Sequence, residues 1–174
     1  KNPEPLSLID RLCKKIVAEA ESDVAIESTT DLTEALTGAD YVILTISTGG
    51  LDAMAHDLDI PWKYGVYQSV GDTVGPGGVA RALRNIPVVL EIARQMEKLC
   101  PDAWLLNYTN PMTTLCRAVC KETSVKTLGF CHGLYEMTGC LEKMFGLADW
   151  HRDTKFTLAG INHLPWMLEL DILG

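Results

Sequence analysis

Residues 39–46 read ADYVILTI, a continuous run of apolar and β-branched residues that decides the fold of this chain. Such a run is typical of a strand buried in a parallel sheet, because helices cover both faces of these sheets. Before it, Thr30 or Asp31 can cap a short helix, since Glu34 follows Asp31 in capping-box spacing. Residues 24–28 (VAIES) predict one more strand. A strand, a helix and a second strand in this order predict a parallel α/β sheet.

The same alternation of helices and strands continues along the chain. The spacing of apolar residues predicts helices over 6–21, 79–99, 111–123 and 134–145, and strands over 103–108, 125–130, 155–161 and 166–173. Pro87 lies inside a predicted helix and should kink or break it. The stretch 47–78 is expected to be a long loop, and such loops in compact domains are usually functional. The predicted fold class is therefore α/β, a Rossmann-like parallel sheet with flanking helices.

The composition is that of a globular domain. The chain has 174 residues, with 15 Lys and Arg against 23 Asp and Glu, and its formal net charge is −8. Hydrophobic residues make up 47% and charged residues 22%, which excludes a disordered or fibrous chain. The acidic excess argues against a nucleic-acid partner, because phosphates are bound by Lys and Arg. We also expect no membrane partner, since no apolar run reaches the roughly 18 residues that cross a bilayer. We expect no secretory signal, since the start KNPEPLSLIDRLCKK has no short apolar core followed by small residues.

Six cysteines lie at positions 13, 100, 116, 120, 131 and 140, within apolar stretches. In a chain long enough to form a core, this spread is typical of reduced intracellular thiols and not of a disulfide framework. The sequence therefore predicts a cytoplasmic protein. All its cysteines except Cys131 are expected to be core thiols.

Four polar segments follow predicted strands, at 45–50 (TISTGG), 107–111 (NYTNP), 131–133 (CHG) and 160–163 (GINH). The ligand crevice of an open α/β sheet lies outside the carboxyl ends of its strands, so we expect these segments to meet there. Thr45, Ser47 and Gly49 would let a cofactor approach the backbone, or they could simply start a helix. Asn107 and Asn110 have amides that suit a sugar or a nicotinamide edge, although Asn is also common in turns.

Cys131 and His163 are candidate metal ligands. A thiolate and an imidazole suit a divalent transition metal, and two protein ligands are too few for a closed structural zinc site. A catalytic metal completed by substrate and water fits this pair better. The alternative is a core thiol together with hydrogen-bonded histidines.

Several motifs, in this order, resemble glycoside hydrolase family 4. They are GDT at 71–73, GPGG at 75–78, RALR at 81–84, PDAWLLNYTNP at 101–111, CHG at 131–133 and NH at 162–163. The resemblance implies a fold like that of lactate and malate dehydrogenases, with NAD and a divalent metal, usually Mn²⁺. It also implies a departure from two-carboxylate hydrolysis. In this chemistry NAD⁺ takes hydride from C3 of the sugar, a base removes the C2 proton, the glycosidic oxygen leaves C1, water adds and the hydride returns.

By this resemblance, Cys131 and His163 match the metal ligands, and Asn110 matches a substrate-contacting residue. His132 stands where phospho-α-glucosidases of the family carry a general acid, so it could assist departure of the leaving group. Asp72 matches a position close to the sugar and is a second catalytic candidate.

The resemblance also matches Thr45, Ser47 and Asn107 to strand ends that line the nucleotide, with Gly49 beside them. The CHG motif is similar to that of the α-galacturonidase and α-glucuronidase branch. A uronic acid carries a carboxylate, and the substrate-binding candidates that could pair with it are Arg81 and Arg84, with Arg152 as a further possibility.

The glycine-rich nucleotide turn and the tyrosine base of the family are not found, so we expect an incomplete N-terminal unit and a chain that covers the middle of a larger enzyme. Residues 1–160 are predicted to form a partial NAD-binding domain, and 161–174 the start of a substrate domain. The predicted function is hydrolysis of α-linked galacturonides or glucuronides by a homodimer or homotetramer. The alternatives are another glycosidase of the family (α-galactosidase, α-glucosidase or 6-phospho-glycosidase), a metal-free 2-hydroxy acid dehydrogenase, and a binding or assembly fragment.

Overall fold

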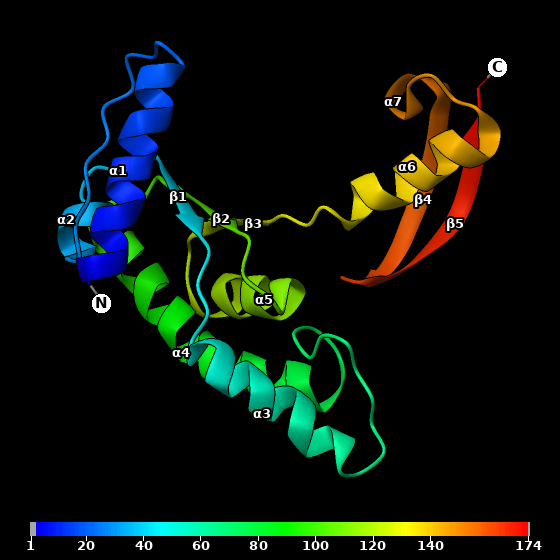
Figure 1. Ribbon diagram of the computed structural model, residues 1–174, viewed down its shortest axis with the longest axis horizontal. Helices are drawn as coiled ribbons and strands as arrows, with labels where there is room; N and C mark the ends of the chain where they lie inside the picture. The colour runs from blue at the N-terminus through cyan, green and yellow to red at the C-terminus, as the bar shows by residue number, and fades with distance from the viewer. Residues whose placement is uncertain (1–2, 174) are drawn as a thin grey trace.

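The structure, a computed structural model, describes residues 3–173, so residues 1, 2 and 174 of the predicted domain ranges lie outside it. Its helices are α1 (Pro3–Glu19), α2 (Leu32–Leu36), α3 (Gly50–Trp62), α4 (Gly75–Leu99), α5 (Met112–Glu122), α6 (Gly133–Phe145) and α7 (Trp150–Asp153). Its strands are β1 (Tyr41–Leu44), β2 (Trp104–Asn107), β3 (Lys126–Gly129), β4 (Thr154–Ile161) and β5 (Leu164–Ile172). Figure 1 shows two parts, one built from α1–α5 and β1–β3 and the other from α6, α7, β4 and β5.

The first part contains a parallel sheet with strand order β1-β2-β3, which confirms the predicted α/β fold class. The register pairs Leu44 with Asn107 and Asn107 with Gly129, which are the last residues of the three strands. The three carboxyl ends are therefore level. The segments that follow them start from a single edge of the sheet.

The core lies on one face of this sheet, against α4 and α5. Successive strand residues point to opposite faces, and Leu44 and Leu105 point to the covered one, where they are 4% and 0% exposed. They form a cluster with buried residues of the two helices, namely Val89, Ala93, Met96, Leu115 and Val119. These helices therefore hold the sheet in place from one side.

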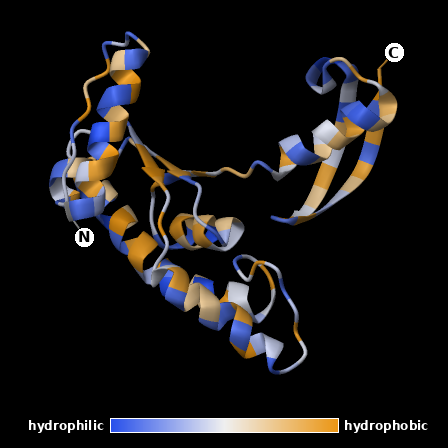
Figure 2. Ribbon diagram, viewed as in Figure 1, coloured by the Kyte–Doolittle hydropathy of each residue, from blue (hydrophilic) through white to orange (hydrophobic). Residues whose placement is uncertain are grey.

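The opposite face of the sheet is exposed, which corrects the expectation that both faces of the 39–46 strand are buried. Tyr41 and Ile43 are 68% and 65% exposed, and Leu128, in register with Ile43 across β2, is 46% exposed. Figure 2 shows hydrophobic residues along these strands. Within residues 3–173 nothing buries this face. An apolar run reports hydrophobicity, but it does not report which element packs on each side.

The predicted cap of the short helix is confirmed. Asp31 Oδ1 accepts hydrogen bonds from the amides of Thr33 at 2.7 Å and Glu34 at 3.2 Å, so it satisfies two donors that the first turn of α2 leaves unpaired. Among the described residues, no helix is long and apolar enough to cross a bilayer.

Three predictions of local structure are wrong. The predicted strand at 24–28 is not formed, because no strand within the described chain pairs with these residues. The stretch 47–78 was predicted to be a loop, but it contains α3. The glycines at the start of α3 and Pro61 in its last turn are typical of loops, so the helix was not predicted. Helix α4 runs unbroken through Pro87, because Pro87 lies on an exposed side, where water can reach the carbonyl that it leaves unpaired, that of Leu83.

In the second part, β4 and β5 form an antiparallel hairpin in which Ile161 pairs with Leu164. Asn162 and His163 therefore form the hairpin turn. The prediction that the segment 160–163 follows a strand of the parallel sheet is wrong, because β4 is antiparallel to β5. The predicted domain boundary at residue 160 falls inside this hairpin and stays a prediction.

The cysteines are all free. Cys100 is buried, and burial raises the pKa of its thiol. Cys120 and Cys140 are exposed, which corrects the expectation that they are core thiols.

Candidate active site

Two buried side chains tie together the segments that follow β1 and β2. Thr109 Oγ1 accepts a hydrogen bond from the Ile46 amide at 2.9 Å. Asn85, on α4, accepts from the Thr48 amide at 3.3 Å and donates from Nδ2 to the Asn110 carbonyl at 3.0 Å. Thr109 lies in the segment 107–111 that the sequence singled out, but sequence reasoning gave neither Thr109 nor Asn85 a role. The available signal for Asn85 was a polar side chain at a core-facing position of an apolar helix.

Asn107 stabilises the carboxyl end of β2 from inside the core. It is 1% exposed, its Oδ1 accepts from the Thr109 amide at 2.9 Å, and its Nδ2 donates to the Thr109 carbonyl and to Cys116 Sγ. Burial raises the pKa of the Cys116 thiol. Because the amide of Asn107 has no free donor, we exclude this residue from the proposed cofactor contacts.

The other candidate cofactor residues lie at the surface of the same edge. Thr45, Ser47 and Gly49 are exposed, and Gly49 has φ +85 at the start of α3. A Cβ on Gly49 would lie 2.6 Å from the Cβ of Ala53. The segment can therefore bring its backbone close to a ligand, but a side chain at position 49 is excluded.

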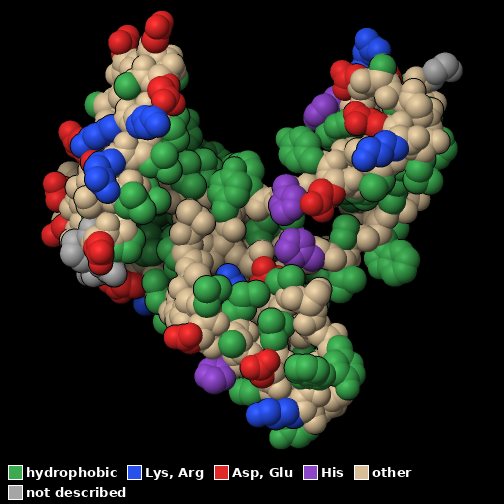
Figure 3. Space-filling model, in the orientation of Figure 1, with side chains coloured by type: hydrophobic (Ala, Val, Ile, Leu, Met, Phe, Trp, Pro, Cys, Tyr) green, Lys and Arg blue, Asp and Glu red, His purple; other side chains and the backbone are tan. Residues whose placement is uncertain are grey.

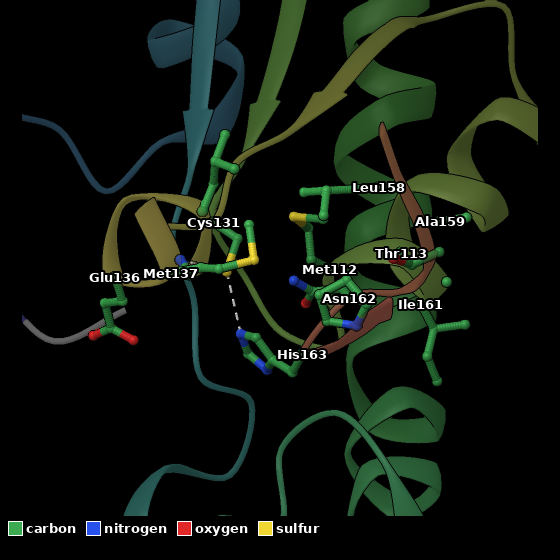
Figure 4. Close-up of a pocket in the computed structure, with 14 residues that line it drawn as sticks. Met112, Thr113, Cys131, Glu136, Met137, Leu158, Ala159, Ile161, Asn162 and His163 are labelled. Carbon is green, nitrogen blue, oxygen red and sulfur yellow. Dashed lines mark hydrogen bonds between the residues drawn. The ribbon is translucent and has the colours of Figure 1, made fainter. Parts of the chain in front are cut away.

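Cys131 and His163 are brought together, as predicted. Cys131 follows β3, His163 is at the tip of the β4–β5 hairpin with φ +66, and their Sγ and Nε2 atoms are 3.2 Å apart. Figure 4 shows the two side chains directed at one another. The hairpin thus carries His163 back to the edge of the parallel sheet.

The spacing of these two atoms fits a shared divalent metal. For zinc, metal–sulfur and metal–nitrogen bonds of about 2.3 and about 2.1 Å, at angles of roughly 90–110°, place the two donors roughly 3.1–3.6 Å apart. Within residues 3–173, no group of three or more His, Cys, Asp and Glu side chains could hold a metal. A metal on this pair would therefore keep open positions, as catalytic sites do.

A chain of hydrogen bonds extends from His163 into the first part. Thr73 Oγ1 lies 3.0 Å from His163 Nδ1 and donates to Asp72 Oδ1 at 3.1 Å. Asp72 Oδ2 accepts from Asn110 Nδ2 at 2.8 Å. The structure therefore connects the predicted Asp72 and Asn110 to the Cys131–His163 pair through Thr73, a residue to which sequence reasoning gave no role.

Two cavities meet at the Cys131–His163 pair. The smaller, of about 340 Å³, is also lined by Asp72, Asn110 and His132. The larger, of about 540 Å³, is mainly apolar and lies between α5, α6 and the hairpin; its lining includes Met112, Leu134, Met137, Leu158, Ile161 and Asn162. Figure 3 shows histidine side chains at the edge of the hollow between the two parts. The polar groups predicted to handle a sugar therefore face the smaller cavity.

His132, Arg84 and Arg81 differ in how many of their side-chain nitrogens already have a partner. His132 is exposed at the start of α6, with Nε2 3.1 Å from Glu136 Oε1. Arg84 forms a bidentate ion pair with the buried Asp57, whose hydrogen bonds raise the pKa of the guanidinium. Both terminal nitrogens of Arg84 already have a partner, so Arg84 is the weaker candidate for binding a substrate carboxylate. Arg81 contacts the Asn110 carbonyl through Nε at 3.3 Å and is the better candidate.

Arg152 is placed away from these residues. It lies on α7, is exposed, and pairs with Asp153, whose pKa is lowered first by the hydrogen bond from the Asp149 amide. Sequence reasoning missed the role of Asp57 as the partner of Arg84. No local pattern indicates this ion pair, because the two residues are 27 positions apart.

The contact between Gly78 and Thr73 leads to the first testable prediction. A Cβ built on Gly78 lies 2.4 Å from the carbonyl carbon and oxygen of Thr73, which are backbone atoms that cannot move alone. We expect Gly78→Ala to destabilise the protein by about 1–3 kcal/mol and to weaken Mn²⁺ binding, because residues 71–74 must shift. Thermal unfolding and Mn²⁺ titration measure the two effects. Gly139→Ala is the control, since its Cβ meets nothing within 4 Å; equal behaviour of the two variants would contradict the prediction.

The chain is similar to known proteins over most of its length. A family model described as "Family 4 glycosyl hydrolase" matches residues 1–147. The chain is 47% identical over 148 residues to an alpha-galactosidase of Bacillus subtilis, a match that covers 84% of this chain and 34% of the relative. It is 44% identical over 142 residues to an alpha-galacturonidase of Thermoanaerobacterium saccharolyticum, covering 78% of this chain and 30% of the relative.

Among solved structures, the fold is similar to that of a 6-phospho-alpha-glucosidase from gut microorganisms, in complex with NAD and Mn²⁺. The TM-score is 0.84 at 26% identity, and the match covers 94% of this chain and 37% of that one. The chain spans about a third of the length of the relatives that it matches. With the family model matching most of its residues, the chain belongs to the family described as Family 4 glycosyl hydrolase.

Proposed function

We propose that this protein is an NAD- and Mn²⁺-dependent glycosidase that cleaves α-linked uronides, either galacturonides or glucuronides. The observation that carries the proposal is the 3.2 Å approach of Cys131 Sγ and His163 Nε2 beside a cavity lined by Asp72 and Asn110. A soft thiolate and an imidazole with open positions suit a catalytic divalent metal. The solved 6-phospho-alpha-glucosidase, which holds NAD and Mn²⁺, supports the same cofactors.

The uronide substrate is supported by three features of the chain. It is 44% identical to a relative named alpha-galacturonidase. It carries the CHG motif at 131–133. Arg81 lies beside Asn110 and donates from Nε to its carbonyl. Within residues 3–173 its two terminal nitrogens make no hydrogen bond, so they can pair with a substrate carboxylate.

When bound, NAD⁺ would accept hydride from C3 of the sugar, and Mn²⁺ would offset negative charge on the sugar oxygens as a Lewis acid. In this proposal Cys131 and His163 hold the metal, and the exposed backbone around Thr45, Ser47 and Gly49 faces the cofactor. Asn110 orients the sugar, and Asp72 keeps the Asn110 amide in place. His132 lines the same cavity, and we propose that it gives a proton to the leaving oxygen.

The substrate class can be tested with the intact protein and a panel of p-nitrophenyl α- and β-glycosides, 6-phospho-glycosides and uronides, each with and without NAD⁺ and Mn²⁺. We expect release from the α-uronides only, and only with both additions. Turnover that needs neither addition would refute the cofactor assignment.

A second candidate within the family is an α-galactosidase, favoured by the 47% identity to a relative of that name. An α-galactoside lacks the carboxylate, so Arg81 would have no charged partner. Faster release from the α-galactoside than from the galacturonide would select this candidate.

A homodimer or homotetramer and a cytoplasmic location stay predictions. Light scattering on the intact protein tests the oligomeric state.

The proposed chemistry predicts an isotope exchange. Elimination removes the C2 proton, and its replacement comes from solvent. We therefore expect turnover in heavy water to place deuterium at C2 of the released sugar, as measured by mass spectrometry and NMR. An acid-catalysed hydrolase acting on the same substrate is the control and should incorporate none at C2. Full turnover without incorporation would argue against elimination.

A further inference from the structure

We propose that Thr73 is a positioning residue, which holds the His163 ring so that Nε2 presents its lone pair to the metal. This inference rests on the proposed function, because it assumes that Cys131 and His163 bind a metal. Metal-bound histidines in general bond through their other ring nitrogen to a neighbouring polar group, which sets the tautomer and orientation of the ring. Thr73 occupies that place here.

The hydrogen-bond geometry selects one tautomer of His163. A hydroxyl has a single proton, and a carboxylate only accepts, so the Thr73 hydroxyl donates to Asp72 Oδ1 at 3.1 Å. Its oxygen must then accept from His163 Nδ1–H, which lies 3.0 Å away. A neutral imidazole protonated at Nδ1 carries its lone pair at Nε2. Nε2 is the atom 3.2 Å from Cys131 Sγ.

The carboxylate that receives the Thr73 proton is itself held in place. Asp72 Oδ2 accepts from Asn110 Nδ2 at 2.8 Å, so both oxygens of Asp72 are engaged. The Asn110 carbonyl in turn accepts from Asn85 Nδ2 at 3.0 Å. Asn85 is fully buried in α4, so the far end of the hydrogen-bond chain is anchored in the core.

The backbone around Thr73 is packed tightly against α4. A Cβ on Gly78 would clash with the Thr73 carbonyl, and Gln68 Nε2 donates to the Val74 carbonyl at 3.0 Å. The hydroxyl therefore projects from a supported loop in the first part of the molecule. His163 is at the tip of a hairpin in the second part, 90 positions along the chain. Thr73 thus positions the hairpin tip as well as the ring.

The test uses Thr73→Val, which keeps the shape of the side chain and removes the hydroxyl. Electron paramagnetic resonance of free Mn²⁺ measures metal affinity in the intact protein without substrate. We expect the Mn²⁺ Kd to rise by about 10–100-fold. With Co²⁺ in place of Mn²⁺, we expect the thiolate-to-metal charge-transfer absorption to change, because His163 is no longer held opposite Cys131. Thr73→Ser retains the hydroxyl and should restore both signals.

Two further variants keep the result interpretable. Thr114→Val removes a hydroxyl from an exposed position on α5 and should leave Mn²⁺ affinity unchanged. Thr73→Ala is a second deletion of the hydroxyl, and thermal unfolding identifies which variants are folded. If the wild type binds Mn²⁺ and a folded Thr73→Val or Thr73→Ala binds it equally well, the role of Thr73 is refuted and the proposed function stands. If the wild type binds no Mn²⁺, both are refuted.

Discussion

Replacing Cys131 with Ser is expected to weaken Mn²⁺ binding by at least about 100-fold and to abolish Mn²⁺-dependent turnover. The thiolate is the soft donor of the pair, and a Ser hydroxyl does not ionise near neutral pH. Only His163 would then remain as a protein ligand, because no other His, Cys, Asp or Glu within residues 3–173 completes the site. Mn²⁺ titration followed by electron paramagnetic resonance, together with turnover at saturating NAD⁺, measures both effects.

Cys140→Ser is the matched control for this experiment. Cys140 is a free, exposed thiol on α6, so the change removes the same sulfur at a position away from the metal pair. We expect wild-type binding and turnover from this variant. If Cys131→Ser kept full activity and turnover did not depend on Mn²⁺, the metal-free 2-hydroxy acid dehydrogenase would become the better interpretation.

Leu105→Ala is expected to lower the free energy of unfolding by about 2–5 kcal/mol. Leu105 is in the central strand β2, is 0% exposed, and belongs to the cluster that joins the sheet to α4 and α5. Truncation removes buried apolar surface and leaves a cavity that strands on both sides prevent from collapsing. Equilibrium unfolding in urea, followed by circular dichroism, measures the change.

Leu83→Ala serves as the control for the core substitution. Leu83 is on α4 and is 69% exposed, so the same change of side chain removes little buried surface. We expect its unfolding free energy to stay within about 0.5 kcal/mol of the wild type. A loss as large as that of Leu105→Ala would show that the exposed side of α4 is covered in solution, and comparable small losses in both would contradict the core assignment.

The strands of the parallel sheet were predictable, and the reason is that each is a short apolar run bounded by turn residues. The runs at 39–46, 103–108 and 125–130 each contain an observed strand, with ends one or two residues inside the predicted limits. The cap at Asp31 was predictable too, since its partners are two and three residues away. By contrast, α3 was missed because glycines and Pro61 gave the stretch the look of a loop.

Some candidate site residues were predictable in identity but not in role. Asn107 and Arg84 were chosen because amides and guanidinium groups bind ligands. In the structure Asn107 orders a buried strand end and Arg84 neutralises Asp57. Chemical type alone did not separate these residues from Asn110 and Arg81, because the difference lies in which partners the fold places beside each side chain.

The sequence by itself determined the α/β class, the motifs that carry the resemblance to the family, and the two residues that are suited to hold a metal. These depend on residue type and on neighbours within a few positions. Only the tertiary structure decided that one sheet face is exposed and that Thr73 contacts His163. Thr73 and His163 are 90 positions apart and Cys131 and His163 are 32 apart. Contacts over such distances depend on how the hairpin packs back on the sheet edge, and no local pattern records that packing.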